Sequence, residues 1–217
     1  LSTGINGAGR FIQDQNRRIC DRSTGNGEQL PLSLTQICAV AGQNRIIALR
    51  QSADESIGVC QLRSCCHFFI DDYQFERVWA RPAAYLECLR GFDCVLTPDF
   101  SLYLDMPDAM QRWNRYRSQA LGHWWQEQGL RVVPTLSWAQ RRSFRFAFDG
   151  VPRRSTVAVS TVGVKGDEGA QAVWREGMAE AMGRLEPARV LLYGGDIGFD
   201  FGACEVVEYK GGGFRGR

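Results

Sequence analysis

The sequence is poor in histidine and lysine. Its 217 residues include two histidines, His67 and His123, and only two of its 26 basic residues are lysines, Lys165 and Lys210. With so few histidines, neither a Ser–His–Asp triad nor a histidine-rich metal centre can be assembled. A bias toward arginine more often follows genomic base composition than ligand binding, so it does not by itself indicate a phosphate-binding protein.

The chain also lacks a long apolar run and a strong charge of either sign. No segment reaches the roughly eighteen consecutive apolar residues that a membrane span needs. The formal net charge of +2 is too small to require a polyanionic partner. A hydrophobic fraction of 44% is enough to build one sizeable core. We therefore expect one main globular domain and no membrane partner.

The eight cysteines show neither a secretory context nor the paired spacing of a zinc site. We expect them to be reduced thiols in a cytoplasmic protein. Cys88 and Cys94 lie in apolar patterns and are expected to pack as small hydrophobic residues. The alternative is a zinc site built from four neighbouring ligands, Cys60, Cys65, Cys66 and His67.

The composition divides the chain near residue 66. Residues 1–66 are rich in Gly, Gln, Ser and Arg and predict an irregular N-terminal segment. Residues 67–209 alternate short apolar runs with longer periodic segments, which indicates an α/β domain. The ending "KGGGFRGR", residues 210–217, predicts a flexible Gly/Arg tail.

Five apolar runs predict strands near residues 67–71, 93–97, 131–136, 155–161 and 189–193. Helical patterns separate them, and the longest, about 107–128, carries Met110, Trp113 and Leu121 at helical spacings. Strands joined through helices form parallel pairs with right-handed crossovers. We therefore predict a mainly parallel sheet of about five strands, open or partly closed.

Polar residues follow each of these strands. In a parallel α/β fold the carboxyl ends of the strands meet at one edge, where ligands bind. The candidate catalytic residues at this edge are Asp71, Asp99, Ser137, Ser160 and Tyr193. The candidate ligand-binding residues are Asp72, Ser101, Trp138, Thr161, Gly163 and Lys165.

The two acids that precede no obvious helix are the most informative of these candidates. Asp72 stands where a helix N-cap is expected, whereas Asp71 and Asp99 are less easily explained by capping. We expect Asp71 and Asp99 to share one polar cleft and to hold a hard divalent cation such as Mg²⁺. The structural alternative for Asp99 is an Asx turn after Pro98.

Two further patterns have both a functional and a structural interpretation. The loop "TVGVKGDEG" could present backbone N–H groups and Lys165 to a phosphate, although it lacks the P-loop order. Arg112, Arg115 and Arg141 could form a nucleic-acid-binding surface beside Trp113 and Trp138. A solvated arginine face is the alternative for the second pattern.

A longer set of motifs carries a family resemblance. The segments "HFFIDDYQFERVW", "VLTPDFSLYLDMPDAMQRWNRYRSQALGHWWQEQG", "VVPTLSW", "FDGVPRRSTVAVSTVGV" and "RVLLYGG" resemble the bacterial and phage family called domain of unknown function 4417, over about residues 67–195. The resemblance implies an intracellular protein associated with phages or mobile elements, and it supplies no reaction or cofactor. After Trp138 the chain has Ala139, Gln140 and two arginines where similar proteins tend to have acidic residues.

Two functions from different classes follow. The first is a metal-dependent hydrolase or phosphotransferase acting on a nucleotide or nucleic acid, with Asp71 and Asp99 at its centre. The second is a non-catalytic module that binds nucleic acid or protein through its Arg/Trp surface. The scarcity of histidine weakens the first, and the near-neutral charge weakens the second.

Overall fold

The structure, a computed structural model, describes residues 47–50 and 64–209. Most of the predicted N-terminal segment and the predicted tail lie outside these residues. Of the four residues of the alternative zinc site, Cys60 lies outside them, and Cys65 is bonded to Cys94 and so is not available as a thiolate ligand. The strands are β1 (Ile47–Arg50), β2 (Ser64–His67), β3 (Cys94–Leu96), β4 (Val132–Val133), β5 (Thr156–Ser160), β6 (Arg189–Tyr193) and β7 (Glu205–Tyr209). The helices are α3 (Asp72–Ala80), η1 (Pro82–Tyr85), α4 (Leu86–Leu89), α5 (Asp108–Glu127), η2 (Arg141–Ser143), α6 (Phe144–Ala147) and α7 (Glu168–Leu185).

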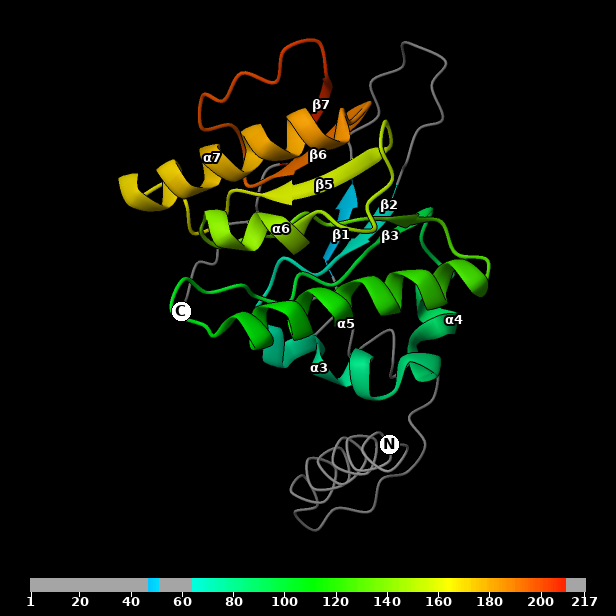
Figure 1. Cartoon of the computed structure of the whole chain (residues 1–217). Helices are drawn as coiled ribbons and strands as arrows, with labels where there is room; N and C mark the ends of the chain where they lie inside the picture. Colours follow the sequence, from blue (N-terminus) through cyan, green and yellow to red (C-terminus); the bar gives the residue numbers. More distant parts are fainter. Residues whose placement is uncertain (1–46, 51–63, 210–217) are drawn as a thin grey trace, which may run out of the picture. The chain divides into compact units, whose positions relative to one another are not determined.

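The strands form two sheets, in the orders β1-β2-β3-β4 and β5-β6-β7. All neighbours from β2 to β4 and from β5 to β7 are parallel, and only β1 runs antiparallel to its neighbour β2. A single parallel bridge, Thr135 to Ala158, joins the two sheets. Figure 1 shows α3, α4 and α5 on one side of the strands and α7 on the other, with α6 between α5 and α7. The predicted α/β class with a mainly parallel sheet is confirmed.

Several strand boundaries differ from the predicted ones. The first predicted strand was placed at 67–71, whereas β2 ends at His67 and the following phenylalanines leave the ladder. The strand predicted at 131–136 shrinks to the two residues of β4, because Pro134 cannot donate to the ladder. β7 was not predicted, since its sequence "EVVEY" is short and rich in charge.

Side chains from the two sheets share one buried cluster, so the sheet is partly closed. The cluster contains Leu96 and Val133 from the first sheet together with Leu191 and Tyr193 from the second. The ring of His67 at the end of β2 lies 4.6 Å from that of Tyr193 at the end of β6. The strands therefore curve until β2 packs against β6.

A disulfide lies inside this cluster and corrects the expectation that the cysteines are reduced. Cys65 and Cys94 are direct partners in the parallel β2–β3 register, and their Cα atoms lie 4.8 Å apart. Their side chains point to the same buried face, so the sulfur atoms meet and bond. Cys94 thus takes part in a cross-link, whereas Cys66 and Cys88 form no disulfide within the described part of the chain.

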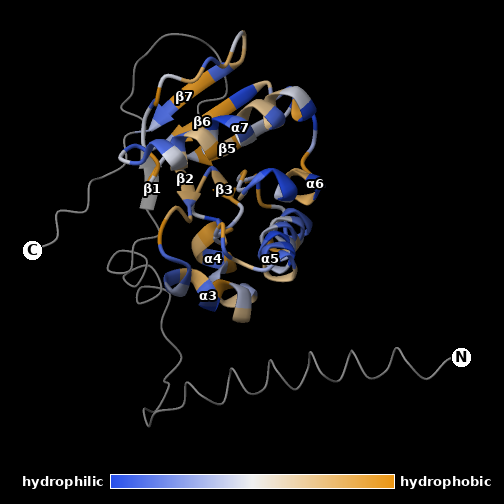
Figure 2. Ribbon diagram, turned by 60° about the vertical axis from the view of Figure 1, so that its left-hand side comes forward, coloured by the Kyte–Doolittle hydropathy of each residue, from blue (hydrophilic) through white to orange (hydrophobic). Residues whose placement is uncertain are grey.

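Hydrophobic residues are concentrated in β5 and β6, and hydrophilic ones run along α5 (Figure 2). All three central residues of each of these strands are buried. Among residues 47–50 and 64–209, no helix combines the length and apolar character needed to cross a membrane.

Helix α5 turns a polar stripe toward the sheet. Met110 and Trp113, which helped to identify the helix, are exposed, and the buried positions of its amino-terminal half are polar. The buried residues are Gln111, Asn114, Arg115, Arg117, Ser118, Leu121, Gly122 and Trp125. At Gly122 the helix lies so close to the sheet that a Cβ would be 2.5 Å from Cγ2 of Thr97. Buried polar side chains need hydrogen-bond partners. We therefore expect the polar groups of the interior to lie next to this stripe.

Candidate functional site

The carboxyl ends of β3 and β4 are fastened together by two threonines. The N–H of Thr135 donates to Oγ1 of Thr97 at 2.8 Å, and Oγ1 of Thr135 donates to the carbonyl of Thr97 at 2.6 Å. Asp99 and Ser137 each follow two residues later, and the Ser137 hydroxyl hydrogen-bonds the Asp99 carboxyl group. The structure therefore brings together two of the predicted catalytic residues.

A second carboxylate is fixed beside them by the loop after β3. Asp72, the first residue of α3, accepts hydrogen bonds from Ser101 through both its backbone N–H at 3.0 Å and its hydroxyl at 2.8 Å. The carbonyl of Ser101 accepts from Nδ2 of Asn114 on α5 at 2.7 Å. These contacts hold Asp72 close enough to Asp99 that its charge raises the pKa of Asp99.

The expected cleft shared by Asp71 and Asp99 is not what the structure shows. Asp71 occupies the N-cap position of α3, is exposed, and accepts a hydrogen bond from Nε2 of Gln74 at 3.2 Å. Asp72, which was expected to cap this helix, is instead the acid next to Asp99. The two acids exchanged roles because the helix begins one residue earlier than the capping interpretation assumed.

Arg115 supplies a buried positive charge to the same place. Its side chain is almost fully buried, at 4% exposure, and Nη1 donates to the carbonyl of Thr135 at 3.1 Å. Nε and Nη2 of Arg115 are buried without a hydrogen-bond partner, and so is Oδ1 of Asp99. Buried polar atoms without partners are rare in folded proteins, and here they belong to two oppositely charged groups that attract each other.

The protonation of Asp99 is tuned by this environment. Burial raises the pKa of the Asp99 carboxyl group from 3.8 to about 7. The Ser137 hydrogen bond and the charge of Arg115 lower this pKa, whereas Asp72 raises it. Burial lowers the pKa of Arg115 to about 10, so the guanidinium stays charged at neutral pH. Asp99 is therefore a carboxyl group that can give up or accept a proton near neutral pH.

A histidine that sequence reasoning did not assign to this edge lies at the end of β2. His67 is fully buried, and its Nδ1 accepts the N–H of Phe69 at 3.1 Å, so the ring proton lies on Nε2. Burial lowers the pKa of His67 to about 4, which keeps the ring neutral. Tyr193, a predicted catalytic residue, stacks on the ring of Phe69 and contacts the His67 ring at a tilt of 41°. The sequence signals for His67 were its place at the start of the apolar run "HFFI" and its three neighbouring cysteines in the alternative zinc site.

The predicted residues after β5 are held in local turns. Oγ of Ser160 accepts the N–H of Val162 at 3.0 Å, and Oγ1 of Thr161 donates to the carbonyl of Gly195 at 2.8 Å. Gly163 takes a positive φ of 80°, and Lys165 lies beside Gly195. The N-terminus of α7 is capped by the Asp167 side chain, whose acceptor oxygen occupies the place a phosphate would take. Phosphate binding by this loop therefore stays a prediction without further support.

Trp138 is part of the packing between helices. Its indole nitrogen donates to the carbonyl of Val173 at 3.2 Å, and the ring covers Gly177, where a Cβ would lie 2.1 Å from Nε1. Only a glycine leaves room for the ring against α7. The tryptophan is thus positioned to support the Ser137 segment, not to contact a ligand at the Asp99 edge.

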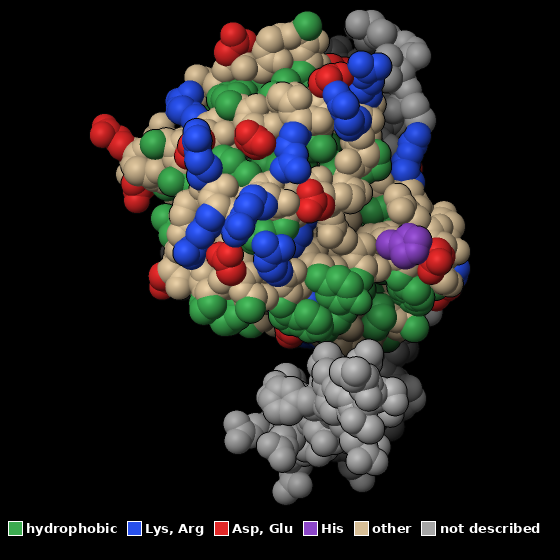
Figure 3. Space-filling model, viewed as in Figure 1, with side chains coloured by type: hydrophobic (Ala, Val, Ile, Leu, Met, Phe, Trp, Pro, Cys, Tyr) green, Lys and Arg blue, Asp and Glu red, His purple; other side chains and the backbone are tan. Residues whose placement is uncertain are grey.

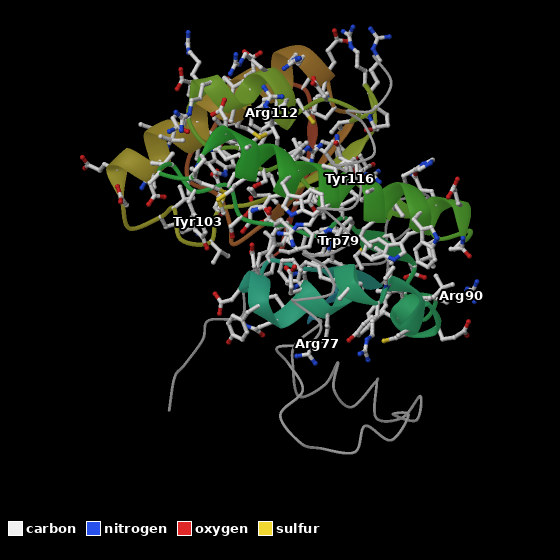
Figure 4. All side chains as sticks on the ribbon, turned by 60° about the horizontal axis from the view of Figure 1, so that its bottom comes forward. Arg77, Trp79, Arg90, Tyr103, Arg112 and Tyr116 are labelled. Atoms are coloured by element: carbon white, nitrogen blue, oxygen red, sulfur yellow. A yellow bond between two sulfur atoms is a disulfide. The ribbon has the colours of Figure 1, made fainter. Side chains whose placement is uncertain are left out.

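The three arginines proposed for a nucleic-acid surface do not lie together. Arg112 packs over the ring of Phe146 at 4.4 Å, Arg141 pairs with Glu176 at 2.7 Å, and Arg115 is buried. Figure 3 shows basic and acidic side chains interspersed across this face, with hydrophobic ones along its lower edge. In Figure 4, Trp79 and Tyr116 lie between α3 and α5, while Arg112 lies on the side of α5 toward α6. The predicted Arg/Trp surface therefore divides into an aromatic part and separate ion pairs.

The donor set near Asp99 does not fit the predicted divalent cation. Within the described part of the chain, no group of three or more His, Cys, Asp or Glu side chains is placed to hold a metal ion. The Asp72 carboxylate already accepts from Ser101, and the nearby Arg115 would repel a cation. We therefore derive no step through a metal.

Comparisons with known proteins give a family but no activity. The family model described as "Domain of unknown function (DUF4417)" matches residues 38–210, which extends the resemblance seen in the sequence at both ends. The "Gene 1 protein" of Mycobacterium phage D29 is 46% identical over 128 residues, which is 59% of this chain and 47% of the phage protein. The "Gene 1 protein" of Mycobacterium phage L5 is 44% identical over 128 residues, or 59% of this chain and 56% of its own length. The chain thus spans about half the length of these relatives, and no solved structure matches it.

Proposed function

The chain belongs to the DUF4417 family, whose members include phage proteins, and on that premise we propose that it is an enzyme that transfers a proton through Asp99. The substrate is a small polar molecule bound between Asp99 and Arg115 at the carboxyl edge of β3 and β4. The observation that carries the proposal is the pair of buried, unpartnered groups, Oδ1 of Asp99 and Nε and Nη2 of Arg115.

Each group has a distinct task in this proposal. Arg115 attracts a negatively charged or strongly accepting group of the substrate, because its two free N–H donors require acceptors. Asp99 gives or takes the proton, and Ser137 orients its carboxyl group. Burial, with a smaller contribution from the charge of Asp72, which Ser101 fixes in place, raises the pKa of Asp99 and keeps its proton bound up to about neutral pH.

The narrower form of the proposal is hydrolysis or phosphoryl transfer on a nucleotide-type substrate. A phosphate group would satisfy the donors of Arg115, and a general base near pH 7 activates the water or hydroxyl that attacks it.

A serine variant tests the assigned roles. The Ser137 hydrogen bond lowers the pKa of Asp99, so replacing Ser137 with Ala should move the pH profile of turnover to higher pH. The measurement is product formation from nucleoside mono- and triphosphates, followed by phosphorus NMR between pH 5 and 9. The control is Ser160→Ala, which removes only a turn contact to Val162 and should leave the profile in place. An unshifted profile in Ser137→Ala, or no turnover of any substrate tried, would count against the proposal.

A second candidate, a nucleic-acid-binding module, is favoured by one observation. Trp113 and Tyr116 are 42% and 56% exposed and stack with their ring centroids 5.6 Å apart. Exposed stacked rings are the kind of platform on which single-stranded bases lie. Replacing both with Ala should weaken single-stranded DNA or RNA binding by about tenfold or more, with a steep salt dependence in the parent. Tyr73→Ala, at 75% exposure, is the control, and no binding at low salt in the parent would eliminate this candidate.

A further inference from the structure

A cavity of about 530 Å³ opens where the two sheets separate. Across the single bridge, the N–H of Ala158 donates to the carbonyl of Pro134 at 2.9 Å, and that of Leu136 donates to the carbonyl of Ala158 at 2.8 Å. The next ladder bond toward the amino ends would need an N–H at residue 134, which is proline. The strands therefore part there, and Pro134 and Thr156 both line the opening.

The walls of this cavity, the arginine cleft, are rich in hydrogen-bond donors. They include three arginines, Arg115, Arg131 and Arg189, together with Gln119, Gln126 and Ser155. Among the described residues, no Asp or Glu lines the cavity. Its volume falls within the range of small-molecule sites, roughly 300–1,000 Å³. The cleft is thus of a size and polarity suited to a small organic anion.

Two of its arginines have buried N–H groups without a partner. Arg115 has two, Nε and Nη2, while its Nη1 donates to Thr135. Arg189 holds Glu205 through Nη2 at 2.9 Å, and its Nε is buried without a partner. These unsatisfied donors come from different elements, α5 and β6, and both residues line the same cavity. A bound acceptor would remove the cost of leaving them unpaired.

The acids near the cleft lie outside its lining. Glu205 pairs with Arg189, and Asp99 and Asp149 attract Arg115. Asp149 itself pairs with Arg184, and the exposed His123 lies 3.5 Å from Glu127. The described lining therefore contains three arginines and no carboxylate.

We infer that the arginine cleft binds a phosphate-bearing small molecule, about the size of a nucleotide. Several guanidinium groups from separate elements match a group with three acceptor oxygens and about two negative charges. A single carboxylate is satisfied by one guanidinium group, which binds it through two N–H donors. Arg115 also belongs to the proposed Asp99 site, and its N–H groups cannot serve two ligands at once. The inference is therefore tested on Arg131 and Arg189, which belong to the cleft alone, and it does not depend on proton transfer at Asp99.

The test measures binding of pyrophosphate and of ATP to the full chain, without added metal, by calorimetry and by thermal shift. The parent should bind both saturably. Arg189→Gln and Arg131→Gln should each weaken binding by about tenfold or more. The matched control is Arg153→Gln, which removes an arginine paired with Glu186 away from the cleft and should change affinity by less than about twofold.

Three results would overturn the inference: no saturable binding of pyrophosphate at millimolar concentration, an equal loss in Arg153→Gln, or citrate binding as tightly as pyrophosphate. The last result would make the cleft a carboxylate site. Asp99→Asn separates the two proposals, because it should leave pyrophosphate binding in place even if it abolishes turnover. Arg115 is not varied, since it is buried and supports the fold.

Discussion

Replacing Asp99 with Asn is expected to stabilise the protein at pH 8 while removing its proposed catalysis. The pKa of Asp99 is about 7 in the folded protein against 3.8 ordinarily, so the folded state binds this proton more tightly than the unfolded state. The stability that this proton contributes is complete below pH 4 and is lost as pH rises through 7. Asn cannot ionise, so the variant keeps its stability across this range.

The size of the effect follows from the pKa difference. About three pKa units correspond to up to roughly 4 kcal/mol in the free energy of unfolding. His67 contributes the opposite slope, because its folded pKa of about 4 makes stability rise with pH up to the ordinary value of 6.5. The difference in the free energy of unfolding between variant and parent therefore reports Asp99 alone. In the parent by itself, the opposite pH dependences of Asp99 and His67 would partly cancel.

Denaturant unfolding of parent and variant at pH 4, 6 and 8 measures this difference. It should be near zero at pH 4 and grow toward pH 8, and turnover should fall by about a hundredfold or more. Asp71→Asn is the matched control, because Asp71 is exposed and holds only Gln74, and its effect should stay within about 0.5 kcal/mol at every pH. A constant difference across pH for Asp99→Asn would show that the carboxyl group is not the buried acid described above.

Removing the Cys65–Cys94 disulfide should destabilise the protein by roughly 3 to 4 kcal/mol. The bond closes a loop with a sequence separation of 29, and opening it frees the unfolded chain. The change is Cys65→Ala with Cys94→Ala, followed by denaturant unfolding with and without a reducing agent. The parent should lose stability on reduction, and the double variant should be insensitive to it.

Cys88→Ala separates the cross-link from the loss of a buried sulfur atom. Cys88 is buried and forms no disulfide with any described residue, so its variant loses packing but should keep the response to reduction. Peptide mapping of the unreduced parent should show the fragments around residues 65 and 94 joined. If alkylation instead modifies both cysteines without prior reduction, the bond is absent and the expectation of reduced thiols would be restored.

The sequence by itself determined the class of the fold and the edge where the site lies. Alternating apolar runs and helical periods are local properties, and the crossover rule converts them into a parallel sheet with its carboxyl ends together. Asp99 and Ser137 were therefore placed on one edge without any knowledge of contacts. The helix near 107–128 was likewise identified from spacing, because α5 spans Asp108–Glu127.

Only the tertiary structure decided which side chains face each other. Whether Asp71 or Asp72 approaches Asp99 depends on the residue at which α3 begins, because each step along a helix turns the side chain by about 100°. Hydropathy assigns arginine to solvent, yet Arg115 is buried since the curved sheet and α5 enclose it together with Asp99. The disulfide depends on the register of β2 and β3, and the arginine cleft depends on the missing N–H of Pro134. Each feature joins segments that are distant in the chain, so the local sequence does not predict it.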